Sequence, residues 1–208
     1  MKQPSWRYDR AEMVADGVVH VIGVALALTG AVVLVVVNLW RAEPSLFVAT
    51  AIYALTLVAT LTMSAVYNMW PVSPFKWKLR KCDHAAIFLL IAGTYTPFAQ
   101  QAGATGLLIF IWTVAAIGFC LKIAFAGRFD RLAVLLYLGL GWSGVGLFRT
   151  LYESFPPIVL VLLLTGGIVY SVGVIFYLWE RLRFQNAIWH VFVLSGAAIH
   201  YSAVLAGV

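Results

Sequence analysis

The chain has 208 residues, of which 63% are apolar and only 11% are charged. Soluble domains carry about 25% charged residues, and one aqueous core cannot hide this much apolar surface, so the composition excludes a soluble globular domain. The net charge of +6 does not require a nucleic-acid partner, because basic residues that flank apolar segments are attracted to anionic lipid head groups.

Residues 1–16 are polar and have neither the short apolar stretch nor the small-residue cleavage site of a signal peptide. We expect them to form a cytoplasmic, interfacial segment, and residues 17–208 to form one transmembrane domain. Apolar runs follow, each near the length of about 20 residues that crosses a bilayer as a helix. The sequence therefore predicts an all-α integral membrane protein, a bundle of seven transmembrane helices. The predicted spans are 17–39, 46–68, 84–101, 105–125, 132–148, 158–179 and 187–207.

Lysine and arginine are distributed unevenly between the two sides that these spans define. Twelve lie on the side of the N-terminus and two on the other side. Positively charged loops stay in the cytoplasm, so we expect a cytoplasmic N-terminus, an outside C-terminus and a multi-pass protein of the inner (plasma) membrane. The twelve are Lys2, Arg7, Arg10, Lys76, Lys78, Arg80, Lys81, Lys122, Arg128, Arg131, Arg181 and Arg183, and the two are Arg41 and Arg149.

Polar side chains inside the predicted spans are few. Such residues are unfavourable in lipid and therefore point to function. Two pairs, Ser64 with Asn68 and Asn186 with His190, are four residues apart and so share one helix face. His200 lies deeper, about 15 Å beyond His190 along the last span. The polar residues at the cytoplasmic ends of the spans are His20, Ser64, Asn68, Asp83, His84, Asn186 and His190.

Each of these residues also has a purely structural interpretation. Asp83 can cap the N-terminus of the third helix, and Ser64 can hydrogen-bond back to its own helix. Asn68 and Asn186 can pair across helices, and a lone histidine is more often a packing residue than a ligand. The gathering of several such residues at one depth favours a site.

Three stretches carry a resemblance to a known family: 64–68 (Ser-Ala-Val-Tyr-Asn), 83–97 (from Asp-His to Tyr-Thr-Pro) and 186–190 (Asn-Ala-Ile-Trp-His). Together with Glu12 and His20 they resemble the hemolysin III family, the bacterial branch of the progestin and adipoQ receptor superfamily. The resemblance covers nearly the whole chain. It implies a seven-helix bundle with a cytoplasmic N-terminus, in agreement with the distribution of Lys and Arg.

The resemblance also implies a zinc site near the cytoplasmic face. In the family three histidines bind the metal, one ending a Ser-x-x-x-His motif and two forming a His-x-x-x-His pair. In eukaryotic relatives this site is linked to ceramidase-like hydrolysis of lipid amides. The matching positions here are Asn68, Asn186 and His190. Ser64 and Asp83 match the serine and aspartate beside the metal, and the resemblance implies catalytic roles for both.

The sequence departs from the family pattern at two of the three metal positions. Asn68 and Asn186 stand where the family has histidine, and an amide oxygen is a poor zinc ligand beside imidazole. We therefore expect zinc binding to be weak or absent. Asn68, Asn186, Ser64 and Asp83 can instead close a hydrogen-bonded network without a cation. Loss of the metal in a natural lineage and deliberate substitution both explain the pattern.

Three classes of function follow for a hemolysin III-like membrane protein of this kind. The first is lipid hydrolysis at a site derived from a zinc-dependent, ceramidase-like hydrolase and linked to membrane lipid homeostasis. The second is a non-catalytic lipid-binding or regulatory role, with a fatty acid or lysolipid in the bundle cavity. The third is a transporter or cytolytic pore with a proton path through His20, Asp83, His84 and His190.

Overall fold

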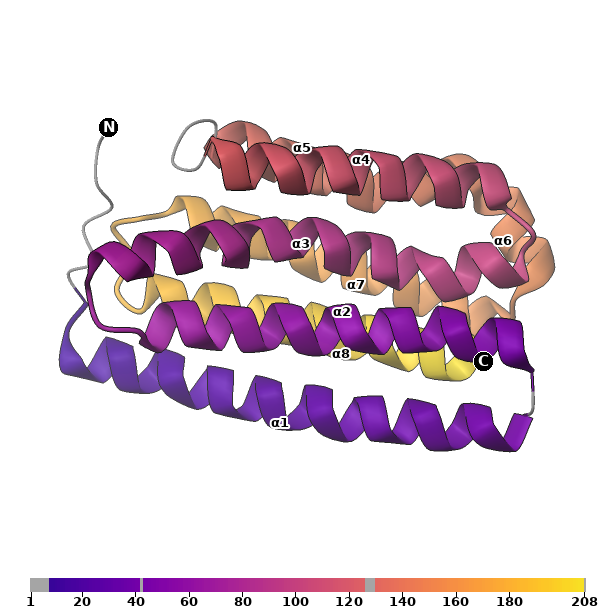
Figure 1. The fold of residues 1–208 in the computed structure, drawn as a ribbon, viewed down its shortest axis with the longest axis horizontal. Coiled ribbons are helices and arrows are strands. Elements are labelled where there is room, and N and C mark those ends of the chain that lie inside the picture. Colours follow the sequence, from indigo (N-terminus) through magenta and orange to yellow (C-terminus); the bar gives the residue numbers. More distant parts are fainter. Residues whose placement is uncertain (1–7, 42, 126–129, 208) are drawn as a thin grey trace.

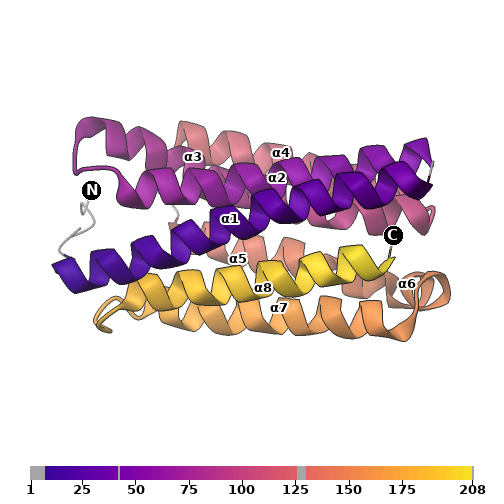
Figure 2. The ribbon, with the colours of Figure 1, turned by 90° about the horizontal axis from the view of Figure 1, so that it is seen from below.

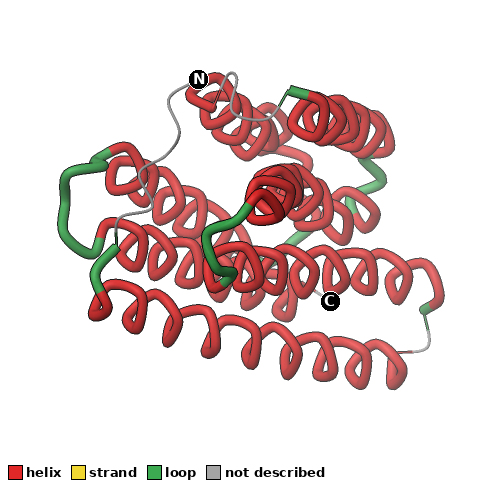
Figure 3. Tube along the Cα trace, turned by 60° about the vertical axis from the view of Figure 1, so that its left-hand side comes forward, coloured by secondary structure: helices red, strands yellow, loops and turns green. Residues whose placement is uncertain are grey.

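A computed structural model describes residues 8–41, 43–125 and 130–207, and within these ranges every secondary-structure element is a helix. The long helices run side by side as one bundle (Figure 1), and short loops join them (Figure 3). The elements are α1 (Arg10–Arg41), α2 (Pro44–Met69), α3 (Pro74–Gln101), α4 (Thr105–Ala124), α5 (Asp130–Trp142), the 3-10 helix η1 (Ser143–Leu147), α6 (Phe148–Ser154), α7 (Pro157–Leu178) and α8 (Gln185–Gly207).

Local sequence signals set several helix ends. Pro44 and Pro74 begin α2 and α3, where the missing backbone N–H would have no partner within the helix. Ser73 caps α3, because its side chain accepts a hydrogen bond from the backbone N–H of Lys76. The turn between α3 and α4 contains Gly103 at a φ of 62°, a left-handed conformation that glycine adopts without strain.

Five helices are long and apolar enough to cross a membrane: α1, α2, α4, α7 and α8. A sixth span results if Leu132–Gly146 and Phe148–Ser154, which meet at an angle of 61°, are counted together. α3 runs beside α2 along the bundle (Figure 1), but it is not among the five, and its first turns carry several charged residues. The structure thus supports five or six spans, and the count of seven stays a prediction.

The predicted fifth span, residues 132–148, is not one continuous helix. α5 ends at Trp142, and η1 follows before α6. The segment is rich in glycine, which weakens a helix, and Tyr95 of α3 binds its backbone. The Tyr95 hydroxyl donates to the Gly141 carbonyl and accepts from the Gly144 N–H. A Cβ atom on Gly144 would lie 2.6 Å from the Tyr95 ring, so this close approach requires glycine.

Apolar side chains fill the interior of the bundle and also cover its outer surface. The main core includes Leu34, Tyr53, Phe98, Val159 and Val204. The outer faces are apolar as well, since only 22% of the most apolar stretch of α4, and the same share for α7, is buried. Apolar faces of this extent are unstable in water, so lipid is the solvent for them. The chain is a multi-pass membrane protein.

One end of the bundle carries most of the basic residues, and we call it the charged end. The N-terminal ends of α1, α3 and α8 meet there with the C-terminal ends of α2, α4 and α7, at the left of Figures 1 and 2. This gathering agrees with the distribution expected from the sequence, whereas the side of the membrane that the charged end faces stays a prediction. Its basic residues in the described ranges include Arg10, Lys76, Lys78, Arg80, Lys81, Lys122, Arg181 and Arg183.

Candidate functional site

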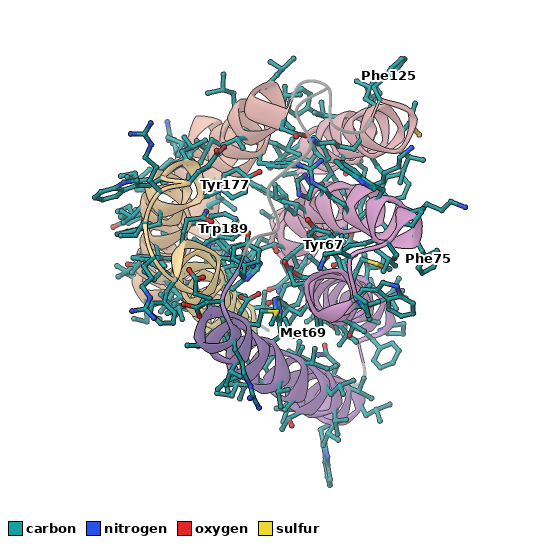
Figure 4. The ribbon with its side chains drawn as sticks, turned by 90° about the vertical axis from the view of Figure 1, so that its left-hand side faces the viewer. Tyr67, Met69, Phe75, Phe125, Tyr177 and Trp189 are labelled. Atoms are coloured by element: carbon teal, nitrogen blue, oxygen red, sulfur yellow. The ribbon has the colours of Figure 1, made fainter. Side chains whose placement is uncertain are left out.

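Six polar side chains from three helices meet at the charged end, and we call them the polar cluster. Each helix contributes two residues that are four positions apart, so both side chains of a pair face the same space. Figure 4 looks onto this end, with Tyr67 and Met69 of α2 and Trp189 of α8 labelled around it. The polar cluster consists of Asp16 and His20 on α1, Ser64 and Asn68 on α2, and Asn186 and His190 on α8.

Asp16 is the centre of the polar cluster, and its side chain is only 6% exposed. Its Oδ1 atom lies 2.6 Å from Nδ1 of His190. Its Oδ2 atom accepts a hydrogen bond of 2.8 Å from Nδ2 of Asn186 and lies 3.5 Å from Nε2 of His20. The carboxylate thereby connects α1 to α8. Because a buried carboxylate is unfavourable unless it is paired, these partners indicate a specific role.

The two asparagines at the positions where the resemblance implies metal ligands bond to each other. Asn186 Nδ2 lies 3.2 Å from Asn68 Oδ1, and Asn68 Nδ2 lies 3.0 Å from the Ser64 carbonyl and 3.4 Å from the Ser64 hydroxyl. The predicted network is therefore present for these three residues, with Asp16 as its carboxylate acceptor. Asn68 and Asn186 do not fit as zinc ligands, because their amides bond to each other and an amide oxygen is a poor zinc ligand beside imidazole, which leaves His190 alone of the three positions.

His20 completes the polar cluster without being fully hydrogen-bonded. Its ring centroid lies 4.3 Å from that of His190, with the planes tilted by 55°. Its Nε2 atom is buried and has no hydrogen-bond partner among the described residues. A small cavity lies beside the two rings and is lined also by Ser64. Its volume, counted as the space that the centre of a water molecule can occupy, is about 20 Å³. About 10–15 Å³ on this measure holds one water, so one small polar species fits here.

The other predicted polar residues lie at the edge of the polar cluster or outside it. Asp83 is buried on α3 and interacts with the hydroxyl of Ser64, so it borders the polar cluster. The His84 ring packs edge-on against an aromatic ring of α2. His200 contacts α7 instead, where its Nε2 lies 3.1 Å from the carbonyl oxygen of Leu163.

A cleft with a volume of about 330 Å³ borders the polar cluster at the charged end. It shares Asp16, Asn68 and Asn186 with the polar cluster. The Lys76 ammonium, also in its lining, donates to the carbonyls of Asn68 and Trp70 at the C-terminus of α2, a favourable position for a cation. The remaining wall is mostly apolar and includes Tyr8, Met13, Met69, Pro71, Val72, Phe184 and Ala187.

The start of α1 is held in place by a reciprocal pair of hydrogen bonds. The Glu12 N–H donates to Asp9 Oδ1 at 2.8 Å, and the Asp9 N–H donates to Glu12 Oε2 at 2.9 Å, which is a capping box. The bond from the Glu12 N–H lowers the pKa of Asp9. The other Glu12 oxygen accepts from the Phe184 N–H at 3.0 Å. These contacts anchor α1 to the loop before α8, close to the point where Asp16 meets His190.

A second carboxylate at the charged end has different partners. Asp130, at the start of α5, accepts from Arg80 of α3 at 2.8 Å and from Lys122 of α4. Partial burial alone would raise the pKa of Asp130, but the hydrogen bonds from Arg80 and Lys122 lower it to about 2. We call these three residues the ion-pair cluster. Its carboxylate is balanced by side chains that carry permanent positive charge.

Asp16 is not among the site residues predicted from the sequence, because it lies in the segment 1–16 that was expected to be polar and interfacial. In the structure α1 begins at Arg10, so the boundary drawn after residue 16 falls inside a helix. Asp16 is buried and not part of a solvated surface. A signal was available in the sequence, because Asp16 and His20 are four residues apart and therefore share a helix face.

Comparison with known proteins gives a consistent result. The sequence matches the family described as Haemolysin-III related over residues 10–201. It is 38% identical over 198 residues to Hemolysin-3 of Bacillus cereus, covering 93% of this chain and 90% of that protein. It is 36% identical over 198 residues to the Hemolysin-3 homolog of Bacillus subtilis (strain 168), covering 93% of both chains.

A mammalian protein matches at greater distance. The human Monocyte to macrophage differentiation factor is 29% identical over 163 residues, covering 74% of this chain and 67% of that protein. The two Bacillus proteins and the family match span nearly all of the described helices. The chain therefore belongs to the hemolysin III family, within the progestin and adipoQ receptor superfamily.

Proposed function

We propose that this hemolysin III family member processes lipids in the inner (plasma) membrane, hydrolysing a lipid amide or ester at the polar cluster as part of membrane lipid homeostasis. The observation that carries the proposal is the cleft, whose lining shares Asp16, Asn68 and Asn186 with the polar cluster. A lipid can place its polar end against these residues while its acyl chain follows the apolar wall. Such a combination of apolar walls and a few polar groups is typical of ligand sites.

The polar cluster and its border contain the groups that acyl hydrolysis requires. Asp16 faces Nδ1 of His190, and a carboxylate in that position orients an imidazole and leaves its other nitrogen to accept a proton. The cavity beside His190 has room for one water. His190 takes a proton from this water, whose oxygen attacks the lipid carbonyl. The departing amine or alkoxide then takes up this proton, directly from the protonated His190 or by way of Ser64 and Asp83 at the border of the polar cluster.

A vesicle assay tests this function. Purified protein is reconstituted with labelled ceramide, phospholipid and lysophospholipid, and fatty-acid release is measured by mass spectrometry. We expect release by the unaltered protein and a loss of about 100-fold or more in His190→Ala, the range for a general acid–base group. His200→Ala is the matched control, because it removes a histidine from the same helix outside the polar cluster. No release from any of these lipids by folded protein contradicts hydrolysis.

A second candidate function is lipid binding without turnover. The closed hydrogen-bonded network of Asn68, Asn186 and Ser64 favours it, because two metal-binding residues of the family pattern are replaced by amides. In that case the cleft retains a fatty acid or lysolipid that native mass spectrometry detects on the purified protein. Met13→Trp, a substitution at an exposed cleft residue, should then displace the lipid. Absence of both turnover and a retained lipid contradicts both candidates.

A further inference from the structure

Among the described residues, the side chains within hydrogen-bond or ion-pair distance of the Asp16 carboxylate include none from Lys or Arg, and Lys76 interacts with it only at longer range. Among the described residues, the side chains that contact Asp16 belong to His20, His190 and Asn186. An amide is neutral, and an imidazole is charged only when protonated. A buried carboxylate without a balancing charge is unfavourable. The Asp16 carboxylate therefore requires a positive charge close by, either a proton on a histidine or a bound cation.

The position of His20 decides between these two. Protonation of His190 would account for its short contact with Asp16. It would still leave Nε2 of His20 buried, 3.5 Å from Asp16 Oδ2 and without a hydrogen-bond partner among the described residues. Unpaired buried nitrogens are rare in native proteins and require an explanation. A cation shared by all three residues resolves both features at once. Each of the three offers one ligand atom, and these atoms all lie within 4.8 Å of one another.

The surroundings of the three residues suit a bound ion. The cavity lined by His20, His190 and Ser64 has room for one water beside these residues. Asn186 donates a hydrogen bond to Asp16 and is itself linked to Asn68. Hydrogen bonds of this kind orient a carboxylate ligand and tune its affinity for metal. Asn186, held by Asn68, thus orients the carboxylate of Asp16, a candidate ligand on α1.

We propose that Asp16, His20 and His190 bind a divalent transition-metal ion, with zinc as the best match. Two imidazoles, one carboxylate and an open position form a ligand set found in catalytic zinc sites, whereas magnesium and calcium select oxygen ligands. The set shares only His190 with the three metal positions that the resemblance implies. Zinc bound here would therefore contradict the expectation, drawn from those three positions, that the chain binds zinc weakly or not at all. The inference names a cofactor for the proposed hydrolysis and rests on that function only for the metal's role. With the metal bound, His190 would be a ligand, and the metal would activate the water in place of the His190 base.

Metal content tests the proposal independently of activity. Purified protein is incubated with excess zinc chloride, freed of unbound metal by gel filtration and analysed by mass spectrometry of the elements. We expect stoichiometric zinc in the unaltered protein and at least about tenfold less in Asp16→Asn and in His20→Gln. Asp130→Asn and His200→Gln are the controls and should retain zinc. Helical circular dichroism and elution volume confirm that each variant is folded.

Three results separate the alternatives. Folded, zinc-loaded protein that retains no zinc overturns the proposal. Zinc that persists in Asp16→Asn and His20→Gln but is lost in Asn68→Ala and Asn186→Ala also overturns it, because the family's positions would then hold the metal. Stoichiometric zinc that depends on Asp16 and His20, without turnover of any lipid, supports the metal site and contradicts only the proposed hydrolysis.

Discussion

Two carboxylates at the charged end of this bundle have opposite surroundings. Asp130 is partly exposed and is bound by Arg80 and Lys122, so its charge is balanced and it holds three helices together. Asp16 is buried, and its nearest partners among the described residues are two imidazoles and an amide. None of these carries a permanent positive charge, and Lys76 interacts with Asp16 only at longer range. A buried carboxylate whose partners carry no permanent positive charge does not stabilise the fold, so such a carboxylate is a candidate for a functional role.

The largest effect is expected when the family's ligands are restored beside Asp16. Asn68→His combined with Asn186→His gives three imidazoles with His190, and zinc affinity should increase. Zinc at 1,000 times its dissociation constant stabilises the folded state by about 4 kcal/mol. The melting temperature in zinc should therefore exceed that in chelator by about 8–16 °C for a chain of this size. Each single reversion should produce a smaller shift, since it leaves the set incomplete.

The restored protein also provides a control for the role of Asp16. In the unaltered protein Asp16→Asn should remove bound zinc, whereas in the double-histidine background it should leave zinc in place. Zinc content after gel filtration measures both. If Asp16→Asn has the same effect in the two backgrounds, Asp16 is not the ligand that replaces the missing histidines.

The next largest effect is a difference in stability between the two clusters. In chelator, Asp130→Asn should lower the free energy of unfolding by about 1–2 kcal/mol, between the values for exposed and buried ion pairs. Asp16→Asn should leave stability unchanged or raise it, because it removes a buried charge and keeps an acceptor for Asn186. Thermal unfolding in detergent measures both variants. A larger loss in Asp16→Asn than in Asp130→Asn contradicts the comparison.

The ion-pair cluster should also produce a specific pH dependence. The pKa of Asp130 is about 2 in the folded protein, below the ordinary value of about 4. Its contribution to stability is therefore fully present above about pH 4 and is lost as the pH falls toward 2. The difference in melting temperature between unaltered protein and Asp130→Asn should shrink over this interval. A difference that stays constant from pH 5 downward would show that the pair does not titrate as expected.

The smallest effect is expected at the contact that anchors α1 beside the polar cluster. Glu12→Ala removes acceptors for the N–H groups of Asp9 and Phe184, which should lower stability by about 1 kcal/mol. Hydrogen exchange should rise in the loop before α8. Glu153→Ala is the control, because Glu153 forms an exposed ion pair with Arg149 in α6 and should change stability by less than about 0.5 kcal/mol. Equal effects of the two variants argue against an anchoring role for Glu12.

Sequence reasoning located the charged end and most of the polar cluster for identifiable reasons. Every second loop is rich in Lys and Arg, which identifies the helix ends that lie on one side of the bundle. Four-residue spacing places Ser64 with Asn68, and Asn186 with His190, on single helix faces. Asp16 escaped notice because it follows several charged residues and looks like part of a solvated segment. Only the packing of α1 against α8 reveals that this carboxylate is buried.

The break between α5 and α6 could not be predicted for a different reason. Residues 132–148 form an apolar run, and hydropathy alone favours one helix across it. The break depends on the contacts of Tyr95, which belongs to another helix and bonds to Gly141 and Gly144. Contacts between distant segments are not visible in a local pattern, so glycine content alone indicates a weak helix but not where it ends.

Lipid turnover in the two aspartate variants tests the central claim, that the polar cluster and not the ion-pair cluster is the functional site. Equal amounts of folded Asp16→Asn and Asp130→Asn protein are reconstituted in vesicles containing the lipid that the unaltered protein hydrolyses, and fatty-acid release is compared. We predict a loss of about 100-fold or more in Asp16→Asn and near-normal release in Asp130→Asn. Undiminished release by Asp16→Asn, or the same loss in both variants, would contradict the claim.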